Sequence, residues 1–167
     1  FITNSQAYQS NLIQYATECY RRAKYTKITG LFQFDFCDPW PAVTWSVLDY
    51  WRTPKSAFDA LRRSMQPVLP CFRMLEKIEA GKANLISFCV VNDLADGLPG
   101  ATCYWRLEGG MGDIASASFP VEIPADGVSA ETKLTLPSLR PGKYKLMATI
   151  ALSNKTLGEN WYELIIQ

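Results

Sequence analysis

A change in the hydrophobic period near Pro70 constrains the fold of this chain more than any other feature. From there to the C-terminus, apolar and polar residues alternate with a period of two, which is typical of half-buried β-strands. The runs are separated by dipeptides that favour turns, such as Asp96-Gly97 and Pro141-Gly142. The pattern predicts strands at 69–75, 83–92, 100–107, 113–123, 129–136, 142–153 and 159–167.

The alternating residues of these runs predict one apolar core between two sheets. The inward candidates are Ile86, Phe88, Val90, Cys103, Trp105, Leu107, Phe119, Val121, Ile123, Tyr144, Leu146, Ala148, Ile150, Tyr162, Leu164 and Ile166. About seven short strands without a helix signal are typical of an immunoglobulin-like sandwich. We expect Trp105 to be the central core aromatic, and Tyr144 stands where a tyrosine corner would form.

The residues before Pro70 follow a helical period, interrupted by one strand-like run. Apolar residues recur at three- and four-residue steps between Ser5 and Tyr25, which predicts a helix with one apolar stripe that includes Tyr8, Leu12 and Tyr15. The aromatic-rich run 31–36 predicts a strand, with Phe32 and Phe36 in the core. Thr53-Pro54 indicates the start of a second helix, which Pro67 ends. A single strand cannot form a sheet, so this half is incomplete by itself.

Composition removes several classes of function. The 17 Lys and Arg residues nearly balance the 16 Asp and Glu residues, so we expect neither a nucleic-acid nor a membrane partner. The absence of histidine removes histidine-based catalysis, and five scattered cysteines without a Cys-x-x-Cys pair argue against a zinc site. We expect no metal and no cofactor, and free thiols slightly favour a cytoplasmic location.

Carboxylates and tryptophans gather between residues 35 and 51. Paired carboxylates remain the catalytic chemistry that the composition favours, although Asp38 before Pro39 could equally cap a turn. Trp40 and Trp45 either pack beneath the loop or present an aromatic face to the C–H-rich face of a pyranose. We predict substrate binding by Trp40, Asp38, Asp35 and Trp45.

The run from Tyr8 to Pro70 resembles the C-terminal end of the catalytic barrel in glycoside hydrolase family 2, the clan of β-galactosidases, β-glucuronidases and β-mannosidases. The motifs that carry the resemblance, in their order along the chain, are Tyr20-Arg21-Arg22, Gly30, Asp38-Pro39-Trp40-Pro41, Ser46-Val47-Leu48-Asp49-Tyr50, Pro54-Lys55 and Pro67-Val68.

The resemblance implies a retaining β-glycosidase that hydrolyses O-glycosyl bonds in carbohydrate on a (β/α)8 barrel. It places 5–25 as helix seven, 28–36 as strand eight and 54–66 as helix eight. The expected fold class is an α+β fragment, with residues 1–68 as the C-terminal segment of the barrel domain and 69–167 as an immunoglobulin-like β-sandwich. The loop from Asp38 to Trp40 would then be a wall of the sugar subsite.

The chain also departs from the family pattern. The family's two catalytic glutamates lie on earlier strands, and no glutamate of this chain matches them, so we expect no catalytic residue here and no activity of the chain alone. Phe34 and Cys37 stand where many members have Trp and Asn. The alternatives are a non-catalytic carbohydrate-binding or structural module, and a partner-binding sandwich. The unpartnered strand at 28–36 predicts pairing with a second copy.

Overall fold

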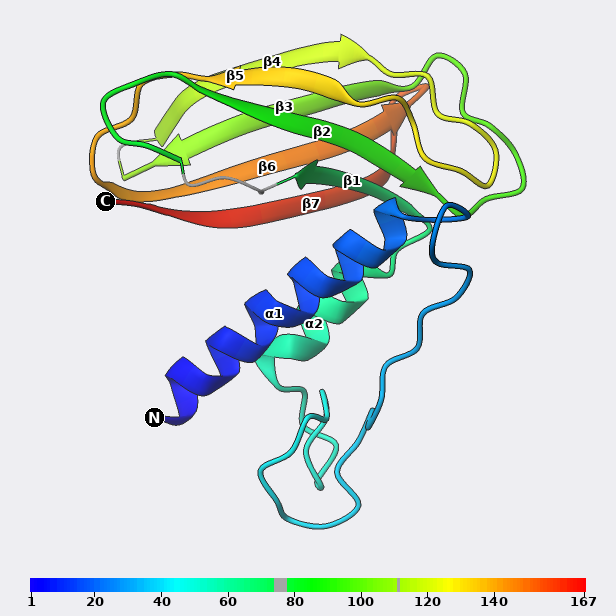
Figure 1. Cartoon of the computed structure of the whole chain (residues 1–167), viewed down its shortest axis with the longest axis vertical. Coiled ribbons are helices and arrows are strands. Elements are labelled where there is room, and N and C mark those ends of the chain that lie inside the picture. Colours follow the sequence, from blue (N-terminus) through cyan, green and yellow to red (C-terminus); the bar gives the residue numbers. More distant parts are fainter. Residues whose placement is uncertain (74–77, 111) are drawn as a thin grey trace. The chain divides into compact units, whose positions relative to one another are not determined.

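The computed structural model describes residues 1–73, 78–110 and 112–167, which form two compact units (Figure 1). The first unit, Phe1–Gln66, contains both helices, and the second, Pro67–Gln167, contains the seven described strands. The predicted α+β class is therefore confirmed. Neither helix is long and apolar enough to cross a membrane within the described part of the chain.

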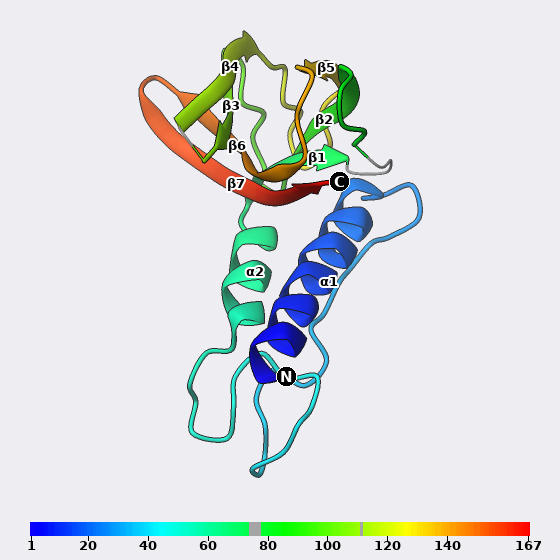
Figure 2. The same cartoon turned by 90° about the vertical axis from the view of Figure 1, so that its left-hand side faces the viewer.

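Helices α1 (Ile2–Arg22) and α2 (Ser56–Ser64) pack side by side in the first unit (Figures 1 and 2). Their contact includes an arginine that reaches the end of α2. Arg21 Nη1 donates to the carbonyl oxygens of Ser64 at 2.5 Å and Gln66 at 2.8 Å. The last carbonyls of a helix have no intrahelical N–H partner, so this guanidinium satisfies part of what α2 leaves open.

The face of α1 that is buried is not the predicted apolar stripe. Tyr8 is 70% exposed and Tyr15 is 51% exposed, whereas Gln14 and Glu18 are buried. Gln14 Nε2 donates to Glu18 Oε1 at 3.0 Å. The prediction was wrong because α1 packs through Ile13 against the cluster of Val47, Ala57 and Leu61 and through polar contacts of Gln14, whereas the predicted stripe meets no apolar surface in the first unit.

The strand predicted at 28–36 does not form. The backbone is irregular there apart from an isolated bridge between Lys24 and Ile28, and Asp35 has a left-handed φ of 53°. The predicted core positions are also wrong, since Phe32 is 92% exposed and Phe36 is 50% exposed. A strand requires a neighbour for its N–H and C=O groups, and the first unit, described throughout, contains no other strand. Pairing of two copies through this segment stays a prediction.

The second unit consists of two antiparallel sheets that face each other (Figure 2). The first sheet has the order β1 (Val68–Arg73), β2 (Asn84–Asn92), β5 (Thr132–Leu136). The second sheet has the order β4 (Gly112–Pro120), β3 (Thr102–Gly109), β6 (Gly142–Leu152), β7 (Lys155–Ile166). The predicted β-sandwich is confirmed, and the end of the strand predicted at 69–75 lies outside the described residues.

The core of this unit joins the inner faces of both sheets. Every inward residue predicted from the alternation lies in this core or packs against it, and Trp105 is 8% exposed. Tyr144 Oη donates to the carbonyl of Arg140 at 2.8 Å, which is the predicted tyrosine corner. All five cysteines are free thiols, so apolar packing holds the two sheets together.

Candidate functional site

Asp38 is the centre of a buried polar cluster in the loop that precedes α2. Its side chain is 1% exposed, and Lys55 Nζ lies 3.0 Å from its Oδ2. The same ammonium donates to Ser46 Oγ at 2.7 Å, and the Thr44 hydroxyl donates to Asp38 Oδ1. Both carboxylate oxygens therefore have partners within the loop itself.

This cluster keeps Asp38 ionised. The hydrogen bonds of Thr44 and Ser46, with a further hydrogen bond and the positive charge of Lys55, lower the pKa of Asp38 from 3.8 to about 2. A carboxyl group with so low a pKa does not donate a proton near neutral pH. In this arrangement Asp38 fixes the loop through its charge and hydrogen bonds.

Backbone hydrogen bonds hold the two ends of the same loop together. Asp38 N donates to the carbonyl of Leu48 at 3.1 Å, and Leu48 N donates to the carbonyl of Phe36 at 3.0 Å. Lys55 N donates to the carbonyl of Val47 at 3.0 Å. Residues 39–45 therefore form a loop whose two ends are joined by backbone hydrogen bonds, although the first unit has no sheet to support it.

Trp40 and Trp45 project from this loop into solvent. Trp40 is 63% exposed and Trp45 is 72% exposed. Gln9 Nε2 on α1 donates to the carbonyls of Trp45 at 2.9 Å and Ser46 at 3.1 Å. The backbone is anchored while both indole rings remain open, an arrangement that suits stacking against an apolar surface or a sugar ring.

The structure does not bring the predicted residues into a carboxylate pair. Asp35 is exposed, and Asp38 interacts with Thr44 and Lys55. The sequence prediction missed the roles of Thr44, Ser46 and Lys55, although Ser46 and Lys55 stand in the motifs that carry the family resemblance. No spacing or motif in the sequence pointed to this ion pair, because Lys55 stands 17 residues after Asp38.

Within the described ranges, no group of three or more cysteine and carboxylate side chains is placed to hold a metal ion. The counter-charge of Asp38 is the Lys55 ammonium.

No family model and no curated protein matches this sequence. Solved structures do match its fold. An exo-chitosanase from Amycolatopsis orientalis matches with a TM-score of 0.81 and 18% identity over 99% of this chain and 19% of that chain. A β-D-mannosidase from Dictyoglomus thermophilum matches with a TM-score of 0.71 and 18% identity, over 96% of this chain and 19% of that chain.

The chain spans about a fifth of the length of these two enzymes. The exo-chitosanase also matches in a complex with PNP-β-D-glucosamine, with a TM-score of 0.78. Along nearly all of its length, this chain is similar in fold to a segment of an exo-chitosanase and of a β-mannosidase, so the resemblance to such glycosidases is confirmed at the level of the fold.

Proposed function

We propose that this chain forms the C-terminal part of a retaining β-glycosidase that hydrolyses O-glycosyl bonds in carbohydrate. In this proposal residues 1–68 are the last segment of a catalytic (β/α)8 barrel, and residues 69–167 are an immunoglobulin-like sandwich that follows it. The observation that carries the proposal is the fold match, which covers 99% of this chain but 19% of the exo-chitosanase.

The exposed apolar surface of the first unit supports this proposal. Tyr8, Leu12 and Tyr15 form an open stripe on α1, and Phe32 and Phe34 are exposed in the segment that follows it. The outer helices of a barrel pack one face against the strands, and large exposed apolar patches mark surfaces that contact another segment. A barrel core provided by further residues would cover both features.

The loop residues take distinct roles in this proposal. Trp40 and Trp45 stack against sugar rings at the wall of a subsite, because their rings are exposed on an anchored backbone. Asp35 accepts a hydrogen bond from a sugar hydroxyl, and Asp38 holds the loop through Lys55. No glutamate of this chain matches the family's two catalytic glutamates, so in this proposal the chain contributes substrate binding and not the chemical step.

The alternative is a non-catalytic carbohydrate-binding or structural module. The coding sequence on the N-terminal side of Phe1 distinguishes the two. The glycosidase proposal expects several hundred further residues with alternating strand and helix periods and a glutamate at a strand end. An open reading frame that begins next to Phe1 would contradict it.

Activity measurements provide the second test. With aryl β-D-glucosaminide, mannoside, galactoside and glucuronide, the 167-residue chain is expected to show no turnover, because none of its glutamates matches the two catalytic glutamates of the family that it resembles. Clear turnover by this chain alone would overturn the assignment of its roles.

In a longer polypeptide that carries this segment with its barrel, Trp40→Ala is expected to raise KM by about five- to tenfold through lost stacking. Trp51→Ala, at a tryptophan that is 70% exposed, is the matched control and should leave KM unchanged. Equal changes of KM in the two variants would show that Trp40 is not part of the subsite.

A further inference from the structure

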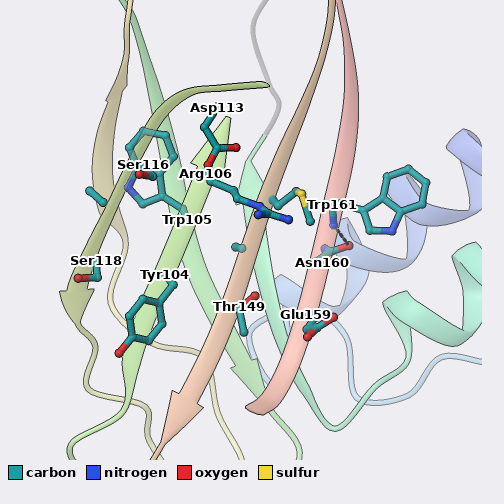
Figure 3. Close-up of a pocket in the computed structure, with 13 residues that line it drawn as sticks. Tyr104, Trp105, Arg106, Asp113, Ser116, Ser118, Thr149, Glu159, Asn160 and Trp161 are labelled. Atoms are coloured by element: carbon teal, nitrogen blue, oxygen red, sulfur yellow. Dashed lines mark hydrogen bonds between the residues drawn. The ribbon is translucent and has the colours of Figure 1, made fainter. Parts of the chain in front are cut away.

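The outer face of the four-stranded sheet is hollowed into a groove of about 660 Å³ (Figure 3). Its lining comes from β3, β4, β6 and β7, all within the second unit. No residue of the loop between α1 and α2 that contains Asp38, called the Asp38 loop below, lines this groove. The groove is therefore a candidate site with its own chemistry.

The strand register arranges the outward side chains of this face in rows across the sheet. One row contains Ser118, Tyr104, Thr149 and Glu159. The next row contains Ser116, Arg106, Met147 and Trp161. Two aromatic residues thus stand on β3 and β7 with one strand between them, which separates their strands by about 10 Å.

The aromatic residues give the groove two apolar contact points. Tyr104 is 52% exposed although its strand lies inside the sheet, between β4 and β6. Trp161 is half-buried, and Lys145 Nζ lies 4.9 Å from the centre of its ring. The two rings stand on strands of one sheet, and their faces suit the C–H-rich face of a pyranose.

Polar groups fill the space between the two rings. Figure 3 shows the Arg106 side chain extending from β3 across the sheet, with Thr149 and Glu159 nearer the end where Tyr104 lies. Arg106 Nη2 is 3.0 Å from Glu108 Oε1, which orients the guanidinium on this face. Hydroxyl, guanidinium and carboxylate groups together offer both donors and acceptors to sugar hydroxyls.

The same polar content argues against a polypeptide as the occupant. Buried centres of protein interfaces are rich in apolar side chains and depleted of charge, whereas this groove contains Arg106, Asp113 and Glu159 besides four hydroxyl side chains. Its two carboxylates against one guanidinium also disfavour an anionic ligand.

We propose that this groove binds a chain of pyranose units, neutral or bearing amino groups. Tyr104 and Trp161 contact sugar faces, and the polar side chains between them bond to hydroxyl or amino substituents. The proposal does not depend on the glycosidase assignment, because its evidence lies wholly in the second unit.

The test is calorimetric titration of the full chain with β-1,4-linked hexamers of glucosamine, mannose and glucose. Tyr104→Ala is expected to weaken binding of the recognised hexamer about five- to tenfold, from the loss of one stacked ring. Tyr104→Phe keeps the ring and should retain binding within about twofold. Tyr20→Ala, at a tyrosine that is 48% exposed on α1, is the control and should leave binding unchanged.

A second variant separates the two sugar classes. Glu159→Gln should weaken binding of the glucosamine hexamer more than that of a neutral hexamer, because a protonated amine loses a carboxylate. Backbone amide shifts on titration should concentrate at Tyr104, Thr149 and Trp161 if the groove is occupied.

Two results would overturn the proposal. The first is no binding of any hexamer at millimolar concentration. The second is binding that Trp40→Ala abolishes and Tyr104→Ala leaves intact, which places the sugar on the Asp38 loop and leaves the glycosidase proposal standing. Conversely, groove binding without a barrel-coding sequence before Phe1 supports this proposal and removes the other.

Discussion

The two units of this chain differ in how far apolar packing accounts for the residues that they bury. The second unit closes apolar side chains of both sheets into one core, with Leu107 and Leu146 fully buried. The first unit has a small apolar cluster that contains Val47, Ala57 and Leu61. It also buries Glu18 and Asp38, while Phe32 is almost completely exposed. Hydrophobic patterning therefore predicts burial only where the partner surface lies in the same unit, as it does in the sandwich.

Hydrogen bonds and an ion pair between side chains stabilise the polar groups that the first unit buries. Arg63 Nη2 donates to Gln14 Oε1 at 3.0 Å, and Lys55 neutralises Asp38. Buried polar groups cost little when they are hydrogen-bonded and a great deal when they are not. The first unit should thus be more sensitive to changes of charge, and the second to changes of volume.

The largest expected effect is in the sandwich core. Leu107→Ala should lower the free energy of unfolding by about 2–5 kcal/mol, because it removes buried methyl groups and leaves a cavity. Leu12→Ala, at a leucine that is 46% exposed on α1, is the matched control and should change stability by no more than about 0.5 kcal/mol. Urea denaturation followed by circular dichroism measures the free energy of unfolding of both variants. Similar losses of stability would contradict the difference in apolar burial between the two units.

Acid should weaken the first unit through Asp38. The folded-state pKa of about 2 lies below the ordinary value of 3.8, so this carboxylate contributes stability that is fully present above pH 3.8. The contribution is lost as the pH falls from 3.8 toward 2. The stability difference between wild type and Asp38→Asn should therefore be large at pH 6 and shrink at pH 2.

Asp59→Asn is the matched control for this titration, since its carboxylate pairs with Arg62 while 66% exposed. Surface ion pairs contribute little, so this variant should follow the wild-type pH profile. A difference between wild type and Asp38→Asn that stays constant from pH 6 to pH 2 would show that the ion pair does not stabilise the loop.

A smaller effect is expected at the tyrosine corner. Tyr144→Phe removes the hydrogen bond to the Arg140 carbonyl and should cost about 1 kcal/mol, because the ring still packs against the core. Thermal unfolding of the two proteins measures the change. An unaltered melting temperature would mean that the ring alone fixes this corner.

The smallest effect is expected at Trp40. Its exposed ring makes Trp40→Ala close to neutral for stability, within about 0.5 kcal/mol in urea denaturation. If Trp40→Ala lowered the free energy of unfolding by several kcal/mol, the ring would be stabilising the first unit. That result would contradict the view that the loop backbone is anchored while its rings are free of packing.

The strands of the sandwich were predictable because their period of two is read directly from residues such as Phe88 and Val90, whose partners lie in the facing sheet. The segment 31–36 has the same local signal but no neighbouring strand, so local preference did not decide its conformation. The presence of the two helices was also predictable. Which face of α1 is buried was not, because that face contacts Arg63 and Ser64, which are distant in the sequence.

For the candidate site, the sequence identified the proline- and tryptophan-rich loop, since Asp38-Pro39-Trp40-Pro41 cannot continue a regular element. It did not reveal that Asp38 would be enclosed by Thr44 and Lys55. These contacts depend on the conformation of the whole loop, because Thr44 and Lys55 lie 6 and 17 residues from Asp38. Neither the hydrophobic period nor a short motif specifies that conformation.

The bond from Arg21 to the carbonyls of Ser64 and Gln66 has a consequence for how this region tolerates change. This one side chain joins the C-terminal end of α1 to the C-terminal end of α2. The two ends of the segment between them are therefore held close together. Loop closure entropy grows slowly with length, by about 0.6 kcal/mol for each doubling. The length of the connection that follows α1 can therefore vary at small entropic cost while the two helix ends stay connected.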